Sequence, residues 1–349
     1  MTLAAPVRAF LDGALREPLD FLTLEEQRQF MRHLSDLNYL RYGRRPDPVA
    51  SVVDHAVPTG AGPVRVREYR PSTGRPLPAH IFLHGGGWWL GAVDELVNDA
   101  MCRYRCLRAG CAVLAIDYPL APRHPFPAAV DAAHAVLSHV IGNPGMWDID
   151  PGSVSVGGVS AGANLVAALA LKCRAEGGPH TILQLLEVPV LDLTRWCAPG
   201  APDPDRHHAD ELIAAVNRYL DGPDPSGPTA GTDPVARGGE RVRERARAPL
   251  ASPLAAPDLS GLPPAHIMTA EMDPLRVDGE LYARRLAEAG VAVTLRPCPG
   301  AIHGVSFLTR VWPPARQWQR SAAEAVRRAH ERTGGAPHRG KGAPPWPTQ

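Results

Sequence analysis

The stretch Gly158-Val159-Ser160-Ala161-Gly162 carries the strongest fold signal in this chain. It fits the G-x-S-x-G pattern, and it stands between a short apolar run at 154–156 and a helix-length apolar segment at 163–176. In a strand-to-helix turn this tight, a Cβ at either glycine would clash with the neighbouring strand or helix. Ser160 is therefore predicted to project above the carboxyl edge of a sheet, at a helix N-terminus that favours negative charge. The pentapeptide alone is equally typical of a glycine-rich turn with a bystander serine, so its surroundings must decide.

Short apolar runs alternate with helix-length segments on both sides of this turn. Strands covered on both faces are apolar at every position, and helices between them indicate a parallel sheet. Residues 52–69 instead alternate apolar and polar side chains around a turn at 60–63, which predicts an antiparallel hairpin. The predicted fold class is therefore α/β, an open doubly wound, mostly parallel sheet with an antiparallel edge. The expected strands are 80–83, 112–116, 154–156, 182–190, 265–270 and 291–295, and the expected helices are 24–40, 93–108, 127–141, 163–176 and 279–289.

The composition excludes several classes of protein. The 349 residues include 37 Lys or Arg and 36 Asp or Glu, a balance that argues against binding to nucleic acid or to an anionic membrane surface. There is no apolar run of about 18 residues, so no membrane span is predicted, and residues 1–18 lack the features of a secretory signal. The six cysteines have no CxxC spacing, so we expect free thiols in a reducing cytoplasm, with neither a disulfide framework nor a metal site.

A second glycine-rich motif follows the expected strand at 80–83. The segment His84-Gly85-Gly86-Gly87-Trp88 matches the HGGG-type loop, whose backbone N–H groups bind the oxyanion that forms in acyl transfer. Glycines at these positions let the backbone approach a substrate without an intervening side chain. A phosphate-binding turn is the alternative interpretation, but neither a GxGxxG pattern nor a P-loop lysine follows.

A serine nucleophile also needs a base and a group that orients the base. In hydrolases with this elbow the chain order is serine, acid, histidine. Asp273 follows one expected strand and His303 follows the last one, so both are predicted to lie at the carboxyl edge of the sheet near Ser160. Glu271 and Asp278 are competing acids; we expect Glu271 to belong to the strand and Asp278 to cap the next helix.

Together these motifs resemble the hormone-sensitive-lipase-like family of α/β-hydrolase esterases. The similarity extends from Val64 to about Phe307, and several motifs in one order are far more specific than any single motif. They are Val66-Arg67-Glu68-Tyr69-Arg70-Pro71, 84–88, Asp117–Pro122 with His124–Ala129, 158–165, Leu259–Ala265, Asp273–Arg276 and His303-Gly304. The resemblance implies an α/β-hydrolase fold with a helical cap.

The resemblance also implies a serine hydrolase site with a catalytic triad and an oxyanion hole. The implied catalytic residues are Ser160 as nucleophile, Asp273 as acid and His303 as base, and the implied oxyanion donors are the N–H groups of Gly85, Gly86 and Ala161. No metal and no organic cofactor is expected in such a site. The N-terminal helices and the segment around 207–219 match the place of the family's cap over the acyl pocket.

The predicted organisation has three parts: an N-terminal helical cap segment (1–50), an α/β-hydrolase catalytic domain (51–333) and a disordered tail (334–349). Within the catalytic domain we expect a cap helix at about 207–221. A mobile surface insertion is expected at about 222–257, because this stretch is rich in Pro, Gly and Arg. Glu187 departs from the family pattern at the end of an expected strand, where it would either contact the pocket or be capped by backbone.

The predicted function is hydrolysis of short-chain acyl esters of small molecules, acetyl esters included, through an acyl-enzyme intermediate. Trp88 and Trp89 stand beside the oxyanion glycines and are candidate walls of a small acyl pocket, although either ring could equally pack into the body or the cap. Three alternatives stay open: an amide hydrolase or deacetylase of a secondary metabolite, a non-hydrolytic dehydratase or cyclase, and a ligand receptor. Intact Ser160 and His303 argue against the last two. We expect a small-molecule ester as partner, a homodimer as assembly and the cytoplasm as location.

Overall fold

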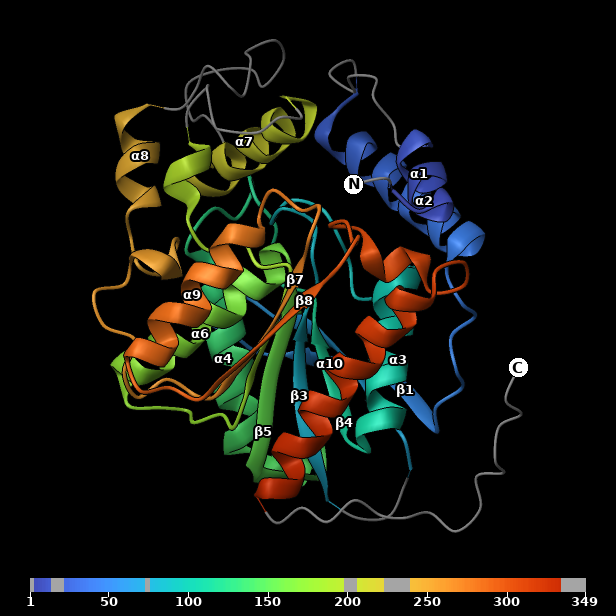
Figure 1. Cartoon of the computed structure of the whole chain (residues 1–349). Helices are drawn as coiled ribbons and strands as arrows, with labels where there is room; N and C mark the ends of the chain where they lie inside the picture. The colour runs from blue at the N-terminus through green and yellow to red at the C-terminus, as the bar shows by residue number, and fades with distance from the viewer. Residues whose placement is uncertain (1–2, 14–21, 73–75, 198–205, 223–238, 334–349) are drawn as a thin grey trace.

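An eight-stranded sheet with the order β1-β2-β4-β3-β5-β6-β7-β8 runs through the middle of the molecule in Figure 1. The computed structural model describes residues 3–13, 22–72, 76–197, 206–222 and 239–333. The predicted tail and the 223–238 part of the predicted insertion lie outside these residues.

The antiparallel edge of the sheet is the predicted hairpin. β1 (Ser51–Val57) pairs with β2 (Val64–Arg70), and β2 pairs with β4 (Ala112–Ile116), both in antiparallel register. Buried and half-buried side chains alternate along most of β2, as the sequence pattern predicts for a strand with one covered face. The prediction of an antiparallel hairpin is confirmed.

From β4 onward every pairing in the sheet is parallel. These strands are β3 (Leu77–Leu83), β4, β5 (Ile149–Val159), β6 (Gln184–Glu187), β7 (Ala265–Ala270) and β8 (Val293–Cys298). β3, β4 and β7 are buried along nearly their whole length, which explains why their sequences are mostly apolar. β8 is the outer strand and is partly exposed throughout, so its sequence mixes polar and apolar residues. The mostly parallel, doubly wound α/β fold is confirmed.

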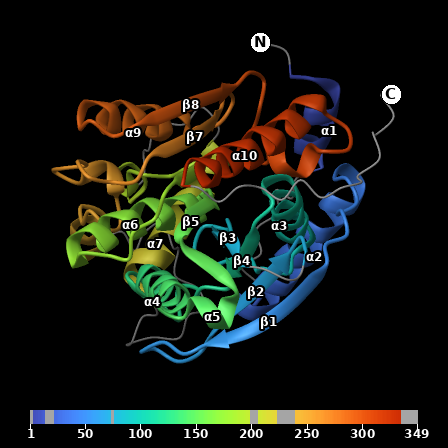
Figure 2. The same ribbon diagram turned by 90° about the horizontal axis from the view of Figure 1, so that it is seen from below.

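Helices cover both faces of the sheet (Figure 2). α4 (Ala128–Gly142), α6 (Ala161–Glu176) and α9 (Arg276–Glu288) pack on one face, and α3 (Leu96–Ala109) and α10 (Pro313–Arg332) pack on the other. The sheet therefore divides the apolar core into two clusters, and neighbouring side chains of one strand enter different clusters. Ile81 lies in the first and Phe82 in the second.

Three further helices lie above the sheet in Figure 1: α1 (Ala5–Asp12), α2 (Leu24–Tyr42) and α7 (Arg206–Asp221). α2 begins with the expected capping box, in which the Thr23 hydroxyl accepts the Glu26 N–H and the Glu26 carboxylate accepts the Thr23 N–H. α1 and α7 contact loops that follow strands. Phe10 packs on Phe307 with ring centroids 5.6 Å apart, and Tyr219 stacks on Trp88.

The described part of the predicted insertion packs against the body. Residues 239–257 include α8 (Glu240–Ala246) and the 3₁₀ helix Pro253–Ala255. Val242, Ala246 and Ala251 are fully or almost fully buried in the first core cluster. The expectation of a surface insertion is therefore wrong for these residues, because Val242 and Ala246, one helical turn apart in α8, and Ala251 beyond the helix bury one side of the segment.

The remaining short elements are α5 (Pro144–Trp147) and two 3₁₀ helices, Leu193–Trp196 and Val305–Leu308. All six cysteines are free thiols. Among the described residues, none of the helices combines the length and the apolar character needed to cross a membrane.

Candidate active site

Ser160 lies in the strained turn between β5 and α6. Its backbone has φ 55° and ψ −118°, a conformation that residues other than glycine rarely adopt. The flanking glycines are required by close backbone contacts. A Cβ on Gly158 would lie 2.4 Å from the backbone of Gly162, and a Cβ on Gly162 would lie 2.1 Å from the carbonyl oxygen of Leu83. The structure thus gives the steric reason for both glycines of the pentapeptide.

Three residues that are far apart in the sequence form one hydrogen-bonded chain beside this turn. His303 Nε2 lies 2.8 Å from Ser160 Oγ, and His303 Nδ1 lies 2.7 Å from Asp273 Oδ2. The second carboxylate oxygen, Oδ1, accepts the N–H of Leu275 at 2.9 Å, which fixes the carboxylate plane. The geometry matches a serine, a base and the group that orients the base, in the order that the sequence predicts.

Burial differs along this chain of residues. The Asp273 side chain is 1% exposed, whereas the His303 side chain is 36% exposed and can meet a ligand. Burial alone would lower the pKa of His303, but the charge of Asp273 and its hydrogen bond outweigh burial and raise that pKa above its ordinary value. A carboxylate that stabilises the imidazolium in this way makes His303 a stronger proton acceptor.

The two competing acids lie elsewhere. Glu271 follows β7 directly, and its carboxylate accepts the N–H of Gly300 at 2.7 Å, which ties the end of the strand to the loop before His303. Asp278 is fully buried and accepts the N–H groups of Leu191 and Asp192 at 2.8 and 3.0 Å.

Asp278 therefore holds the turn that follows β6. It is the third residue of α9 and does not cap the start of that helix, so the capping role expected from the sequence is wrong. Burial raises the pKa of Asp278 to about 6, although the two backbone N–H groups and Arg195 oppose the rise. Its carboxylate is paired with Arg195 and with the N–H groups of Leu191 and Asp192.

The glycine-rich loop lies directly beside Ser160. A Cβ on Gly85 would lie 3.6 Å from the Ser160 Cβ. Gly86 has φ 118°, and a Cβ there would lie 2.2 Å from the Leu90 carbonyl oxygen, so only glycine fits. The N–H groups of Gly85, Gly86 and Ala161 donate no hydrogen bond to any of the described residues. Three unused donors therefore lie around the serine.

His84 fixes the shape of this loop. Its buried imidazole donates from Nδ1 to the Gly85 carbonyl at 2.8 Å and stacks on the Tyr118 ring, with centroids 4.2 Å apart. The Tyr118 hydroxyl in turn donates to the His84 carbonyl at 2.9 Å. Burial lowers the pKa of His84, which keeps the ring neutral. The loop is thus held by side chains on both sides.

The two tryptophans after the glycines occupy different surroundings. Trp88 is fully buried and stacks face to face on Tyr219 of α7, with ring centroids 4.5 Å apart and planes at 8°. Trp89 is half-buried; the Arg218 guanidinium lies 4.2 Å from its ring centroid, and its carbonyl accepts Arg28 Nε at 2.9 Å. Both residues therefore connect the glycine-rich loop to the helices above the sheet. Their predicted effect on the acyl pocket stays a prediction.

Glu187, the other residue left open by the sequence, faces away from this site. Its side chain is 1% exposed and pairs with Arg105 of α3, and it accepts Trp318 Nε1 of α10 at 2.6 Å. Neither alternative expected from the sequence, a contact with the pocket or capping by backbone, describes this arrangement.

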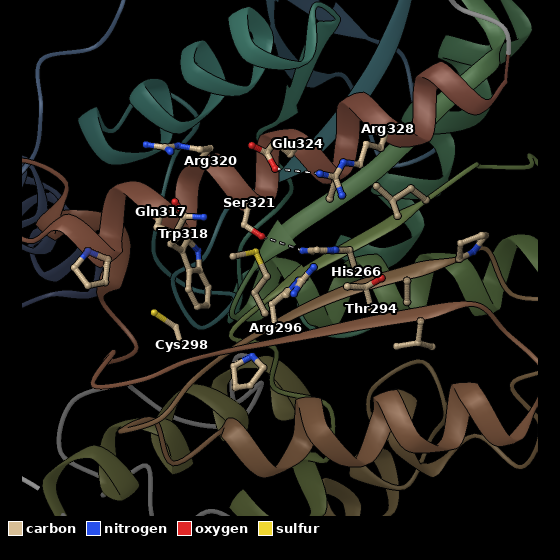
Figure 3. A pocket seen from close by; sticks show the side chains of 18 of the residues that line it. His266, Thr294, Arg296, Cys298, Gln317, Trp318, Arg320, Ser321, Glu324 and Arg328 are labelled. Carbon is tan, nitrogen blue, oxygen red and sulfur yellow. Dashed lines mark hydrogen bonds and ion pairs between the residues drawn. The ribbon is translucent and has the colours of Figure 1, made fainter. Parts of the chain in front are cut away.

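A groove of about 1130 Å³ lies elsewhere, between α10 and the strands β7 and β8 (Figure 3). Ser160, Asp273 and His303 are not among the residues that line it. His266 Nε2 lies 3.5 Å from Ser321 Oγ across the groove, and burial together with the charges of Arg296 and Arg328 lowers the pKa of His266 to about 4. Within the described ranges, no group of three or more His, Cys, Asp or Glu side chains is arranged to hold a metal ion.

Comparisons with known proteins agree with the fold. A family model described as alpha/beta hydrolase fold matches residues 80–307. The carboxylic ester hydrolase LipN of Mycobacterium tuberculosis is 39% identical over 275 residues; the match covers 74% of this chain and 65% of that protein, so the chain spans just under two thirds of LipN. The carboxylesterase NlhH of the same organism is 37% identical over 276 residues, which cover 77% of this chain and 80% of NlhH.

Solved structures give the same result. An esterase from Pyrobaculum calidifontis superposes with a TM-score of 0.77 at 31% identity, and the superposition covers 94% of this chain and 99% of that one. The fold and the hydrogen-bonded Ser–His–Asp arrangement define an α/β-hydrolase of the serine type. The chain belongs to the hormone-sensitive-lipase-like family of α/β-hydrolase esterases.

Proposed function

We propose that this chain is a serine carboxylesterase that hydrolyses short-chain acyl esters of small molecules, acetyl esters among them. The observation that carries the proposal is the hydrogen-bonded chain from Asp273 through His303 to Ser160, with three unused N–H donors next to the serine. A nucleophile, its base and an oxyanion site are the parts that acyl transfer requires.

The steps follow from these positions. Ser160 Oγ attacks the ester carbonyl carbon while His303 Nε2 takes the hydroxyl proton. Asp273 holds the imidazole and stabilises the imidazolium that forms. The N–H groups of Gly85, Gly86 and Ala161 would stabilise the negative oxygen of the tetrahedral intermediate; these three residues act through their backbones.

His303 then donates its proton to the leaving alcohol, which leaves Ser160 acylated. A water molecule attacks the acyl-enzyme with His303 again as base, and the acid is released. The side chains drawn into this scheme supply all of the proton transfers.

Two finer parts of the proposal rest on the sequence. A short acyl group is favoured by the bulk of Trp88 and Trp89 next to the glycine-rich loop. A homodimer in the cytoplasm is the expected assembly and location; light scattering of the purified protein and fractionation of the source cells test them.

The direct test of the function is covalent labelling of Ser160 by a fluorophosphonate, combined with kcat/KM for p-nitrophenyl esters from acetyl to octanoyl. We expect labelling at Ser160 alone, turnover that declines with chain length, and loss of both in Ser160→Ala. Loss of the serine typically lowers the rate by several orders of magnitude. Near-native turnover by a correctly folded Ser160→Ala protein would exclude the mechanism.

A further inference from the structure

A buried ion pair lies directly behind the turn that carries Ser160. The Arg105 side chain is 3% exposed and the Glu187 side chain 1% exposed, and their charges meet inside the core. Trp318 Nε1 donates to the second carboxylate oxygen of Glu187 at 2.6 Å. Figure 3 shows Trp318 pointing inward from α10 toward the sheet. One carboxylate is therefore held from two helices, α3 and α10, that cover the same face of the sheet.

The backbone of Glu187 is bonded to Ser160 itself. Glu187 is the last residue of β6 and pairs in register with Val159, the last residue of β5. Its carbonyl oxygen accepts the Ser160 N–H at 2.8 Å. The same residue thus holds the nucleophile through its backbone and is itself held through its side chain.

The residue after Glu187 is strained in a way that bears on this bond. Val188 has φ 42°, although a β-branched residue rarely adopts a positive φ. Strain of this kind persists only where the surroundings hold the chain on both sides. The Val188 N–H donates to the Met268 carbonyl on β7 at 2.9 Å, and the Glu187 carboxylate is held by Arg105 and Trp318.

The simplest relaxation of Val188 is a rotation of the peptide plane between Glu187 and Val188. This rotation returns φ of Val188 to negative values with little movement elsewhere, because only two neighbouring dihedrals change. The same plane carries the Glu187 carbonyl, so a rotated plane no longer presents that oxygen to the Ser160 N–H. Ser160, with its own positive φ, would lose the contact that keeps it in its turn.

Arg105 adds a second link to the site. Its guanidinium lies 4.9 Å from the centroid of the Phe82 ring, and Phe82 is the second-last residue of β3, from which the glycine-rich loop emerges. The ion pair therefore contacts the end of β6 and the end of β3, the strands on either side of β5.

We infer that Glu187, held by Arg105 and Trp318, is a positioning residue for Ser160: the clamped carboxylate keeps the 187–188 peptide plane oriented so that its carbonyl binds the Ser160 N–H. The inference rests on the proposed function, because it assigns Glu187 a role in the reactivity of Ser160. Glu187 touches no substrate and transfers no proton.

The test distinguishes a role in positioning Ser160 from a contribution to stability. It replaces the three side chains of the buried polar cluster, Arg105, Glu187 and Trp318, together. Removing one member of a buried ion pair leaves an unpaired charge, whereas replacing all members with apolar side chains of similar volume is often neutral for stability. The variant is therefore the triple change Arg105→Met, Glu187→Leu and Trp318→Phe. We expect a Tm close to the wild type, a kcat lower by about 10²-fold and a nearly unchanged KM, because a misplacement of about 1 Å costs about that much. The rate constant of fluorophosphonate labelling at Ser160 should fall in parallel.

A matched control removes another buried polar cluster from the same sheet. Ser155, in the second half of β5, bonds to His80 at 2.8 Å and to His330 of α10 at 3.0 Å, and it is fully buried. Ser155→Ala should lower the Tm while kcat stays near the wild-type value. A loss of kcat in this control as large as in the triple variant would contradict a specific role for Glu187.

A folded triple variant with wild-type kcat overturns the inference. If that variant does not fold, Glu187→Gln decides at a temperature well below its Tm: a kcat reduced tenfold or more supports positioning, and an unchanged kcat overturns it. A wild-type protein that neither hydrolyses esters nor reacts with the fluorophosphonate would refute the proposed function instead, so the two failures are distinguishable.

Discussion

Gly162→Ala adds a single methyl group where a Cβ would come closer to a neighbouring atom than at any other described glycine. The new Cβ would lie 2.1 Å from the carbonyl oxygen of Leu83 and 2.4 Å from that of His84. Both neighbours are backbone atoms at the end of β3, where no side chain can rotate away. The start of α6 and the end of β3 must therefore move apart.

The size of this movement follows from ordinary contact distances. A carbon and a carbonyl oxygen seldom approach within about 3.3 Å, so the two segments must separate by about 1 Å. Ser160 is the N-cap residue of α6 and the glycine-rich loop continues from β3, so the added distance opens between Ser160 and the Gly85 and Gly86 N–H groups. We expect kcat/KM to fall by about 10²-fold and the free energy of unfolding to fall by about 1–3 kcal/mol, as in other overpacked cores.

The assay compares kcat/KM on p-nitrophenyl acetate with the Tm of the same preparations. Gly142→Ala at the end of α4 is the matched control, because a Cβ there meets nothing within 4 Å. The control should keep the wild-type activity and Tm. If Gly162→Ala also kept both, the close approach of α6 to β3 would be wrong, and with it the steric reason for this glycine.

Three further predictions concern the proposed site. Asp273→Asn should lower kcat about 10⁴-fold, because it favours the wrong tautomer of His303. Asp278→Asn should lower the Tm and leave kcat within a few-fold of the wild-type value. Steady-state kinetics and thermal melts of both variants test this difference. Because Asp273 raises the pKa of His303, and the base must be neutral, kcat/KM should fall as the pH decreases, with a midpoint above about 6.5 in a pH–rate profile. Trp88→Ala and Trp89→Ala should raise kcat/KM for esters with longer acyl chains relative to kcat/KM for the acetyl ester, by roughly 1 kcal/mol per accommodated methylene. A chain-length profile that is unchanged in both variants would show that the two rings serve packing alone.

The central sheet could be predicted because buried parallel strands leave a simple pattern. β4 and β7 coincide with their apolar runs at 112–116 and 265–270. β5 begins five residues earlier than its run, since Asp150, Pro151 and Gly152 interrupt the apolar pattern without ending the strand. Such a boundary depends on pairing with β3, which local sequence does not report.

α10 is the largest element that the sequence analysis does not identify. Its buried face includes Ala315, Trp318, Ala322 and Val326, whose spacing of three or four residues is helical. Alanines between many arginines give only a weak hydrophobic periodicity, so the sequence pattern does not reveal this helix, although Pro313 and Pro314 are typical of a helix start. The buried face of α8 is missed for the same reason, since Val242 and Ala246 lie among arginines.

The candidate site was easier to predict than parts of the fold, because its backbone geometry demands glycine at fixed positions. Gly86, Gly158 and Gly162 each meet backbone atoms at less than 2.5 Å if given a Cβ, and such requirements are visible in the sequence itself. The choice among acids was different. Asp273 and Asp278 are five residues apart, and only the packing of α9 against the 191–192 turn shows that Asp278 serves another part of the molecule.

Arg105, which the sequence analysis does not mention, and Glu187, whose partner it does not find, are understood only through each other. Arg105 lies on the buried face of α3 with Met101 and Cys102, where a charge conflicts with the apolar pattern. Glu187 ends an apolar strand and conflicts with its pattern in the same way. Either charge alone would be costly in the core. The two side chains form an ion pair although they lie 82 residues apart in the sequence, so each compensates the charge of the other. Two opposite charges in two apolar segments thus predict a contact between those segments, and here that contact lies behind the turn that carries Ser160.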